Sequence, residues 1–266
     1  MYDAFSNDYD RFVNWPARLA FELPFIEDQL RRLQPGAPGA PIRILDAACG
    51  TGQHALALAK KGFAVSGADL SEGMIARARE NSSAAGMEIP FAVAGFDSLA
   101  GLYPPESFDA LLCLGNSLPH LISRPNLGAA LSAFARLLRP GGLLLVQNRN
   151  FDAVLARQER WMDPQSDRSE DTDRVFIRFY DFRPDGLISF NILTLRREKL
   201  GEWKQTITTT LLRPQTRAEL VELAGRASFE EIEIFGSLDG SPFDPQNSGN
   251  LVLVGWNGKP ATSTAS

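Results

Sequence analysis

A short turn with two glycines and a nearby carboxylate is the first stretch of the sequence able to hold a ligand. Gly50 and Gly52 lie between an apolar run at 42–45 and a helix-forming segment at 53–61. Glycine lets a backbone approach a ligand without a Cβ in the way, and the N–H groups of a first helical turn face that ligand. Asp46 follows the apolar run directly. The pattern therefore predicts a small-molecule site with an acidic rim.

The turn alone fits two kinds of ligand. Its spacing, Gly50-x-Gly52-x-x-Ala55, matches the dinucleotide fingerprint, whose third position takes Gly or Ala, so a nicotinamide-dependent oxidoreductase stays open. Asp46 argues against that reading because a carboxylate repels a pyrophosphate and attracts a cation or an ammonium group. The sequence also has no Tyr-x-x-x-Lys or similar hydride-transfer set.

With Asp46 in front of the glycines, the turn resembles the first motif of the class I S-adenosylmethionine (SAM) methyltransferases. SAM is a sulfonium with an amino-acid tail, and an acidic rim suits it. Asp69 lies 17 residues after Gly52, close to the ~20 expected for an acid that grips ribose hydroxyls. The resemblance implies that Asp69 binds the SAM ribose. The alternative is an acid that favours the start of a helix before Ser71.

The same resemblance implies further contacts with SAM. Leu70 and Met74 would touch the adenine, with a core role for Met74 as the alternative, and Phe96 would either stack on the adenine or belong to the core. Gly95 stands where the family has a polar residue. Arg18 loosely resembles the arginine that holds the SAM carboxylate in the glycine N-methyltransferases, which the segments discussed next also resemble. The expected cofactor contacts are Tyr9, Arg18, Asp46, Ala48, Gly50, Gly52, Asp69, Leu70, Met74, Phe96, Asp97 and Leu114.

A second group of polar residues follows two further expected strands. Ligands of open α/β sheets bind beyond the carboxyl ends of the strands, so the segments 114–121 and 147–152 should face a substrate. Their sequences, Leu-Gly-Asn-Ser-x-x-His-Leu and Gln-Asn-Arg-Asn-Phe-Asp, resemble glycine N-methyltransferase and the related glycine/sarcosine methyltransferases, with the likeness covering roughly residues 5–155. It implies that Asn116 touches an amino-acid substrate, His120 lies at the cofactor–substrate junction and Arg149 pairs with the substrate carboxylate.

Arg149 also has a physical argument of its own. A guanidinium placed directly after a buried strand needs an anionic partner, and its planar fork fits a carboxylate in a bidentate manner. Alternatives stay open for all three residues. Arg149 could pair with a protein acid such as Asp152, His120 could be a hydrogen-bonded loop histidine, and Asn116 could be a turn residue.

The tyrosines and the other histidine are assigned more simply. That family surrounds the sulfonium and the substrate with several tyrosines, and Tyr9 and Tyr180 are the candidates for this role here. We expect His54 to be structural. Methyl transfer is a direct displacement, so we predict no dedicated general base, although His120 could accept the proton.

Alternating strands and helices must position these residues, which predicts an α/β fold with helices on both faces of the sheet. We expect a Rossmann-like seven-stranded mostly parallel sheet plus a small inserted antiparallel sheet. The expected strands of the main sheet are 42–47, 64–68, 91–94, 108–114, 143–147, 229–235 and 250–256, and the main expected helices are 53–61, 125–138 and 216–227.

The chain divides into five expected parts. These are a helical lid at 1–34, a SAM-binding core at 35–150, an inserted antiparallel subdomain at 151–214, a return to the core at 215–258 and a disordered tail at 259–266. The insert should contain strands at 175–182, 187–196 and 203–212, with a hairpin turn at 184–186. The polar segment 157–174 reads as a solvated loop or as a mobile flap.

Composition excludes several classes of function. The net charge of −5 argues against nucleic-acid binding, and no apolar run approaches the ~20 residues of a membrane span. The two Cys and two His are scattered, which predicts no metal site and two reduced thiols in a cytoplasmic protein. The start of the chain, acidic and without an apolar core, does not read as a signal peptide.

We therefore predict a SAM-dependent methyltransferase that methylates the amine of a small, carboxylate-bearing molecule and releases S-adenosylhomocysteine (SAH). Two alternatives share the fold: a methyltransferase acting on the oxygen or nitrogen of a larger metabolite, and a non-catalytic SAM-binding module. The sequence leaves the acceptor, the number of methyl groups and the oligomeric state open.

Overall fold

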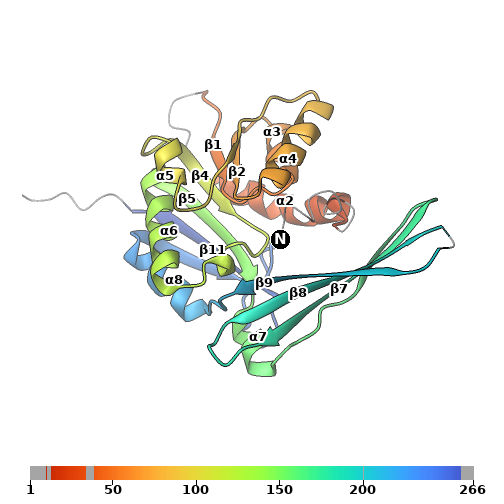
Figure 1. Ribbon diagram of the computed structural model, residues 1–266. Coiled ribbons are helices and arrows are strands. Elements are labelled where there is room, and N and C mark those ends of the chain that lie inside the picture. Colours follow the sequence, from red (N-terminus) through yellow and green to blue (C-terminus); the bar gives the residue numbers. More distant parts are fainter. Residues whose placement is uncertain (1–9, 11–12, 34–38, 200, 259–266) are drawn as a thin grey trace, which may run out of the picture.

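The computed structural model describes residue 10 and residues 13–33, 39–199 and 201–258 (Figure 1). Tyr9, most of the linker before the first strand and the expected tail at 259–266 lie outside these residues.

A seven-stranded sheet forms the centre of the molecule, in the order β10-β11-β5-β4-β1-β2-β3 (Figure 1). The pairs from β5 to β3 are parallel, whereas β11 runs antiparallel to both β5 and β10. This arrangement confirms the predicted fold class. The strands are β1 (Arg43–Asp46), β2 (Ala64–Asp69), β3 (Phe91–Val93), β4 (Phe108–Cys113), β5 (Leu138–Arg149), β10 (Phe229–Phe235) and β11 (Asn250–Asn257).

Helices cover both faces of this sheet because its central strands are apolar on both sides. In β4, Leu111 and Cys113 belong to one core cluster, while Ala110 and Leu112 belong to the other. The first cluster packs under α5 (Leu99–Leu102), α6 (Arg124–Leu137) and α8 (Arg217–Arg226), and the second under α2 (Trp15–Arg31), α3 (Gln53–Ala59) and α4 (Glu72–Ala84). Side-chain oxygens of Asn14, Ser71, Ser123 and Thr216 cap helix starts, as such residues are expected to do.

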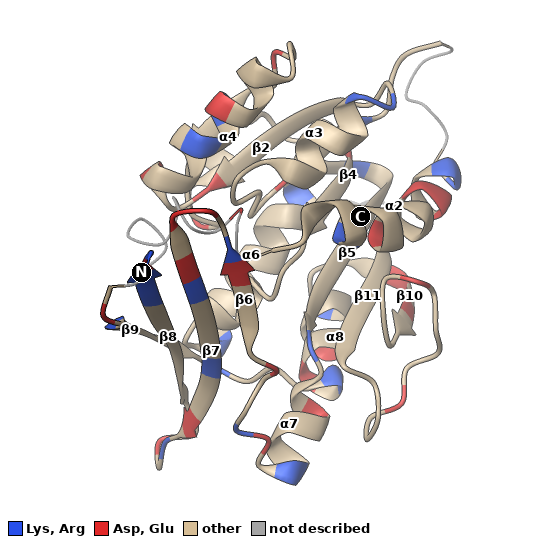
Figure 2. Cartoon of the chain, turned by 90° about the vertical axis from the view of Figure 1, so that its right-hand side faces the viewer, with Lys and Arg blue, Asp and Glu red and all other residues tan. Residues whose placement is uncertain are grey.

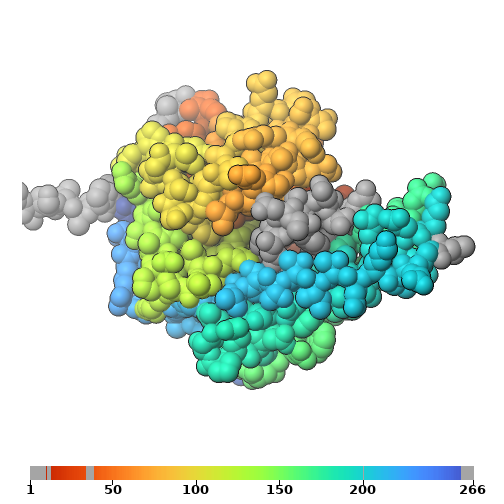
Figure 3. All heavy atoms as spheres, in the orientation of Figure 1, coloured from red at the N-terminus to blue at the C-terminus, as the bar shows by residue number. Residues whose placement is uncertain are grey.

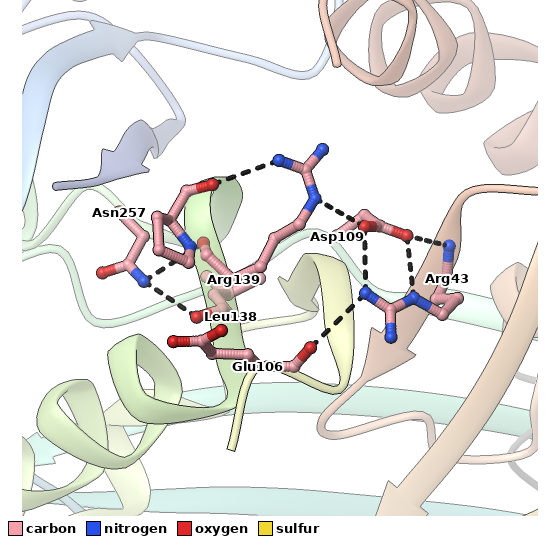
Figure 4. Close-up of polar contacts among 7 residues, drawn as sticks. Arg43, Glu106, Asp109, Leu138, Arg139 and Asn257 are labelled. Atoms are coloured by element: carbon pink, nitrogen blue, oxygen red, sulfur yellow. Dashed lines mark hydrogen bonds and ion pairs between the residues drawn. The ribbon is translucent and has the colours of Figure 1, made fainter. Parts of the chain in front are cut away.

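A cluster of polar contacts lies at the end of the sheet where the parallel strands begin (Figure 4). The buried carboxylate of Asp109 accepts from Arg139 Nε at 2.6 Å and from Arg43 Nε at 3.1 Å. Burial alone would raise the pKa of Asp109, but the hydrogen bonds from these arginines hold it below its ordinary value. The Asn257 amide donates to the backbone carbonyls of Ala135, Leu138 and Arg139. These contacts anchor β5 from Leu138 onward, so the strand begins five residues earlier than predicted.

A separate antiparallel sheet projects from the core at one side (Figures 1 and 3). Its strands, in order, are β6 (Gln165–Arg168), β7 (Thr172–Phe182), β8 (Ile188–Glu198) and β9 (Lys204–Leu212). The last three confirm the predicted strands. A small cluster joins the base of the sheet to α7 (Phe151–Arg157) through Phe151, Tyr180 and Ile188.

The first strand of that sheet was not predicted. The structure places 165–168 in β6 and 172–174 in β7, so the prediction of a loop through 157–174 is wrong for these residues. Cross-strand ion pairs explain the difference: Arg174 lies opposite Asp167 and pairs with it, and Arg197 pairs with Asp173. Figure 2 shows this mixture of acidic and basic residues on β6 and β7. Opposite charges on facing residues stabilise these strands, although their polar sequence does not predict a sheet.

Candidate active site

The glycine turn and Asp69 lie side by side at the edge where the parallel strands end. Asp69 closes β2, and its Oδ2 accepts a hydrogen bond from the Gly50 N–H at 2.9 Å. Its Oδ1 accepts from the Ser71 N–H at 2.9 Å, at the start of α4. Asp69 thus fits both interpretations offered from the sequence: it borders the glycine turn, where a ribose would bind, and it lies at the start of the next helix.

The two glycines have left-handed backbone conformations, with φ of 53° at Gly50 and 77° at Gly52. A Cβ on Gly52 would lie 2.9 Å from Phe91 Cζ and 3.0 Å from Ala78 Cβ. The space beside Gly52 is therefore filled by β3 and α4. The glycine at position 52 therefore serves packing beneath the turn, and its contact with SAM stays a prediction.

Asp46 is an acid of this edge with a strongly perturbed pKa. Its side chain is 1% exposed, and its Oδ1 has no hydrogen-bond partner among the described residues. Burial, together with the charge of Asp69, raises the pKa of Asp46 to about 7, against smaller opposing effects of the Ala48 N–H and of Arg18. A buried, unpartnered carboxylate oxygen beside a second acid favours the binding of a cation.

Arg18 extends from α2 toward the same edge. Its Nε donates to both carboxylate oxygens of Glu22, at 3.0 and 3.1 Å, and its guanidinium lies 5.1 Å from the Trp15 ring centre. A terminal nitrogen of Arg18 is 3.9 Å from the point that a Cβ on Gly115 would occupy. The guanidinium therefore reaches the loop after β4 while its charge acts on Asp46.

The loops after β4 and β5 are held together by Asn116. Its backbone has φ of 68°, and its side-chain Oδ1 accepts from the Arg149 N–H at 2.9 Å. Its own N–H donates to the Gln147 carbonyl, and the Gly115 N–H donates to Gln147 Oε1. Asn116 is thus a turn residue, as the alternative held, and its amide nitrogen is the group that it can offer to a substrate.

Arg149 pairs with Glu159, whose Oε1 accepts from its terminal nitrogen at 3.0 Å. The alternative partner named from the sequence, Asp152, is wrong: Asp152 accepts from the Arg217 N–H at the start of α8. Arg149 Nε is buried and has no hydrogen-bond partner among the described residues. Because the Arg149–Glu159 pair is partly exposed, it is a weak pair that a bound anion can replace.

His120 belongs to the segment after β4, and Tyr180 lies on β7 of the second sheet. His120 ends the short 3₁₀ helix η1 (Leu118–His120), and burial lowers its pKa to about 4, so its imidazole is neutral near pH 7. Tyr180 is 1% exposed and packs against Phe151 and Phe190. Burial raises its pKa to about 12, against an opposing effect of the Arg149 charge. Its ring is enclosed by protein, so its contact with substrate stays a prediction.

The expected adenine contacts form a second small group. The Leu70 side chain is 76% exposed, and both Leu70 and Asp97 fold over Gly95, whose missing Cβ would meet them at 3.4 and 2.9 Å. This packing explains the glycine at position 95. Phe96 lies edge-on to Phe134, on the core side of the loop. Met74 and Leu114 are buried, whereas Ala48 is partly exposed.

Three residues near this edge were missed or undervalued in the sequence. Glu22 and Asp10 were not singled out, and His54 was expected only to be structural. Asp10 accepts hydrogen bonds from Thr51 and Arg77, so it ties the start of the chain to the glycine turn and α4. The spacing of Arg18 and Glu22, four residues apart on one helix, is the signal that could have found the pair.

Two surface hollows lie away from this edge. One, of about 460 Å³, includes Arg43 and Ala64, and the other, of about 780 Å³, includes Ser82 and Pro90. Both lie toward the amino ends of the strands, the opposite side from ligand sites of such sheets, so neither is assigned. Within the described ranges we find no group of His, Cys, Asp and Glu that could hold a metal ion. Nor does any helix there have the length and apolarity needed to cross a membrane.

Comparison with known proteins identifies the class to which this fold and site belong. Residues 44–142 match the family described as a methyltransferase domain. An S-adenosylmethionine-dependent methyltransferase from Clostridium acetobutylicum ATCC 824 has the same fold, with a TM-score of 0.76 at 17% identity over 97% of this chain and 99% of that one. The acidic, cation-attracting edge at Asp46 and Asp69 fits the sulfonium, ammonium and ribose of SAM.

Relatives of similar sequence support the same class. A glycine/sarcosine N-methyltransferase from Aphanothece halophytica is 30% identical over 204 residues, which are 74% of each chain. Another from Halorhodospira halochloris is 35% identical over 158 residues, 58% of this chain and 54% of that one. The chain belongs to the SAM-dependent methyltransferase family, and SAM is its cofactor.

Proposed function

We propose that the enzyme transfers a methyl group from SAM to the amine nitrogen of a small, carboxylate-bearing molecule of the glycine or sarcosine type. The observation that carries this proposal is Arg149, a half-buried guanidinium at the end of β5 with an unpartnered Nε and a partner, Glu159, that it can exchange. The names of the related N-methyltransferases support the same substrate class.

On the cofactor side, three charged residues would hold SAM. Asp46 offers its unpartnered Oδ1 to the ammonium group, Asp69 accepts from the ribose hydroxyls, and Arg18 presents its terminal nitrogens to the carboxylate. SAM supplies an electrophilic methyl group on a sulfonium. The residues of this chain contribute position and electrostatics, and positioning alone is worth up to roughly 7–11 kcal/mol of the barrier.

On the substrate side, the ion pair between Arg149 and Glu159 breaks, and Arg149 then binds the substrate carboxylate in a bidentate manner. The Asn116 amide nitrogen fixes the acceptor from the neighbouring loop. A positive sulfonium nearby disfavours the ammonium form of the acceptor, so its nitrogen keeps the lone pair that attacks the methyl group. Because its pKa is lowered to about 4, His120 is a weak base and does not need to accept the proton of the acceptor amine. That proton leaves to solvent.

Arg149→Ala tests the carboxylate clamp. We expect kcat/KM for glycine or sarcosine to fall on the order of 100-fold, as when one partner of a charge pair formed on binding is truncated, and kcat/KM for methylamine to change little. Arg157→Ala, which removes an exposed arginine of α7, is the matched control and should change neither. Equal losses on both acceptors would reject the clamp.

Glu159→Gln is a complementary test. Removing the competing carboxylate should lower KM for glycine or sarcosine, because Arg149 no longer has to exchange partners. A raised KM would mean that Glu159 itself holds the acceptor.

A further inference from the structure

A buried polar contact joins α2 to α3, the helix that follows the glycine turn. His54, the second residue of α3, places its Nε2 2.6 Å from Glu22 Oε2 on α2. Both side chains are enclosed, with Glu22 8% and His54 5% exposed. Since Gly52 is the cap of α3, this histidine is fixed to the turn itself.

Protonation states decide what the contact does. Burial lowers the pKa of His54, so the imidazole is neutral and donates its Nε2–H to the carboxylate. Burial alone would raise the pKa of Glu22, but the hydrogen bond from His54 and the charge of Arg18 lower it instead. The ionised Glu22 therefore accepts from two donors at once, the His54 ring and Arg18 Nε.

Arg18 is fixed as a result. Glu22 occupies its Nε, and the Trp15 ring lies beside the guanidinium while also meeting His54 edge-on at 5.6 Å. One terminal nitrogen of Arg18 lies beside the loop at Gly115. A long, flexible side chain is thereby ordered before any ligand arrives, which reduces the entropic cost of binding one.

We propose that Glu22 and His54 are positioning residues, which align Arg18 from the glycine turn so that its terminal nitrogens receive the carboxylate of SAM. The inference rests on the proposed role of Arg18 in holding that carboxylate. The plainer alternative is that the pair only staples α2 to α3 and contributes stability.

A second acid of the same helix provides a matched control. Glu27 also joins α2 to the segment just after α3, through Lys61 at 2.7 Å, and pairs with Arg31, but within the described part of the chain no ion pair links it to Arg18. Glu27→Gln therefore removes a staple of the same kind without touching the guanidinium.

The test compares two ligands by calorimetry. SAH carries the amino-acid carboxylate, whereas 5′-methylthioadenosine has the same nucleoside and thioether without it. We expect Glu22→Gln to raise the Kd of SAH about tenfold and that of methylthioadenosine less than twofold. Arg18→Ala should act in the same direction and at least as strongly, and Glu27→Gln should leave the ratio of the two Kd values unchanged.

Two histidine variants keep the test decisive should Glu22→Gln fold poorly. His54→Leu, which removes the donor, should weaken SAH selectively, and His54→Gln, whose amide can still donate to Glu22, should restore it. If these variants weaken the binding of both ligands equally, the Glu22–His54 pair only holds α2 against α3. If Arg18→Ala weakens SAH selectively and neither Glu22→Gln nor His54→Leu does, the positioning role is overturned alone. If Arg18→Ala leaves SAH binding intact, the proposed role of Arg18 fails as well.

Discussion

The raised pKa of Asp46 makes the affinity for SAH depend on pH. The ammonium group of SAH needs the ionised carboxylate, whereas the protonated acid offers it little. A pKa of about 7 in the ligand-free protein means that about 90% of Asp46 is ionised at pH 8 and about 10% at pH 6. The Kd of SAH should therefore rise about tenfold between pH 8 and pH 6.

Calorimetry measures both the affinity and the protons that binding releases. At pH 6, titration of SAH in two buffers of different ionisation enthalpy should reveal the release of about 0.9 proton per ligand, falling to about 0.1 at pH 8. Asp46→Asn should bind SAH more weakly and without this pH dependence. A wild-type Kd that stays constant from pH 6 to pH 8, or proton release that persists in Asp46→Asn, would refute the reasoning.

Three further predictions follow from the same structure. Asp109→Asn should lower the free energy of unfolding by about 2–4 kcal/mol in urea titrations, because it removes the buried carboxylate that accepts from both Arg43 and Arg139. This contribution is present above the ordinary pKa of 3.8 and lost as the pH falls through the lowered folded value. Gly52→Ala should cost about 1–3 kcal/mol through strain and overlap with Phe91, and Phe91→Leu should recover part of that loss in the double variant. The pH profile of kcat between 6 and 9 should contain no inflection from His120, so His120→Gln should change its height but not its shape.

The regular elements were largely predictable from local pattern. The strand at 229–235 was predicted with the bounds of β10, and α6 begins and ends within a residue of the predicted helix, because apolar periodicity and capping residues act over short distances. β6 and the early start of β5 were not predictable in this way. β6 is stabilised by charge pairs across a short hairpin, such as Arg174 with Asp167, rather than by an apolar pattern. The early start of β5 depends on a distant residue, Asn257, which donates to the carbonyl of Leu138.

Part of the candidate site was also predictable from the sequence, and part was not. The turn, Asp46 and Asp69 were predictable because the ends of parallel strands must meet at one edge. The contact between Glu22 and His54 was not, since it joins residues on two helices whose packing no spacing rule fixes. Nor was the unusual pKa of Asp46, which follows from complete burial beside Asp69.

The most direct test of the account is the identity of the methylated product. The enzyme is incubated with SAM carrying an isotopically labelled methyl group and with a panel of glycine, sarcosine, methylamine and an amino sugar, and the products are weighed by mass spectrometry. We predict labelled N-methyl product from the carboxylate-bearing amines, with one SAH formed per methyl transferred. Labelled amino sugar or methylamine with unmodified glycine and sarcosine would contradict the proposed acceptor class.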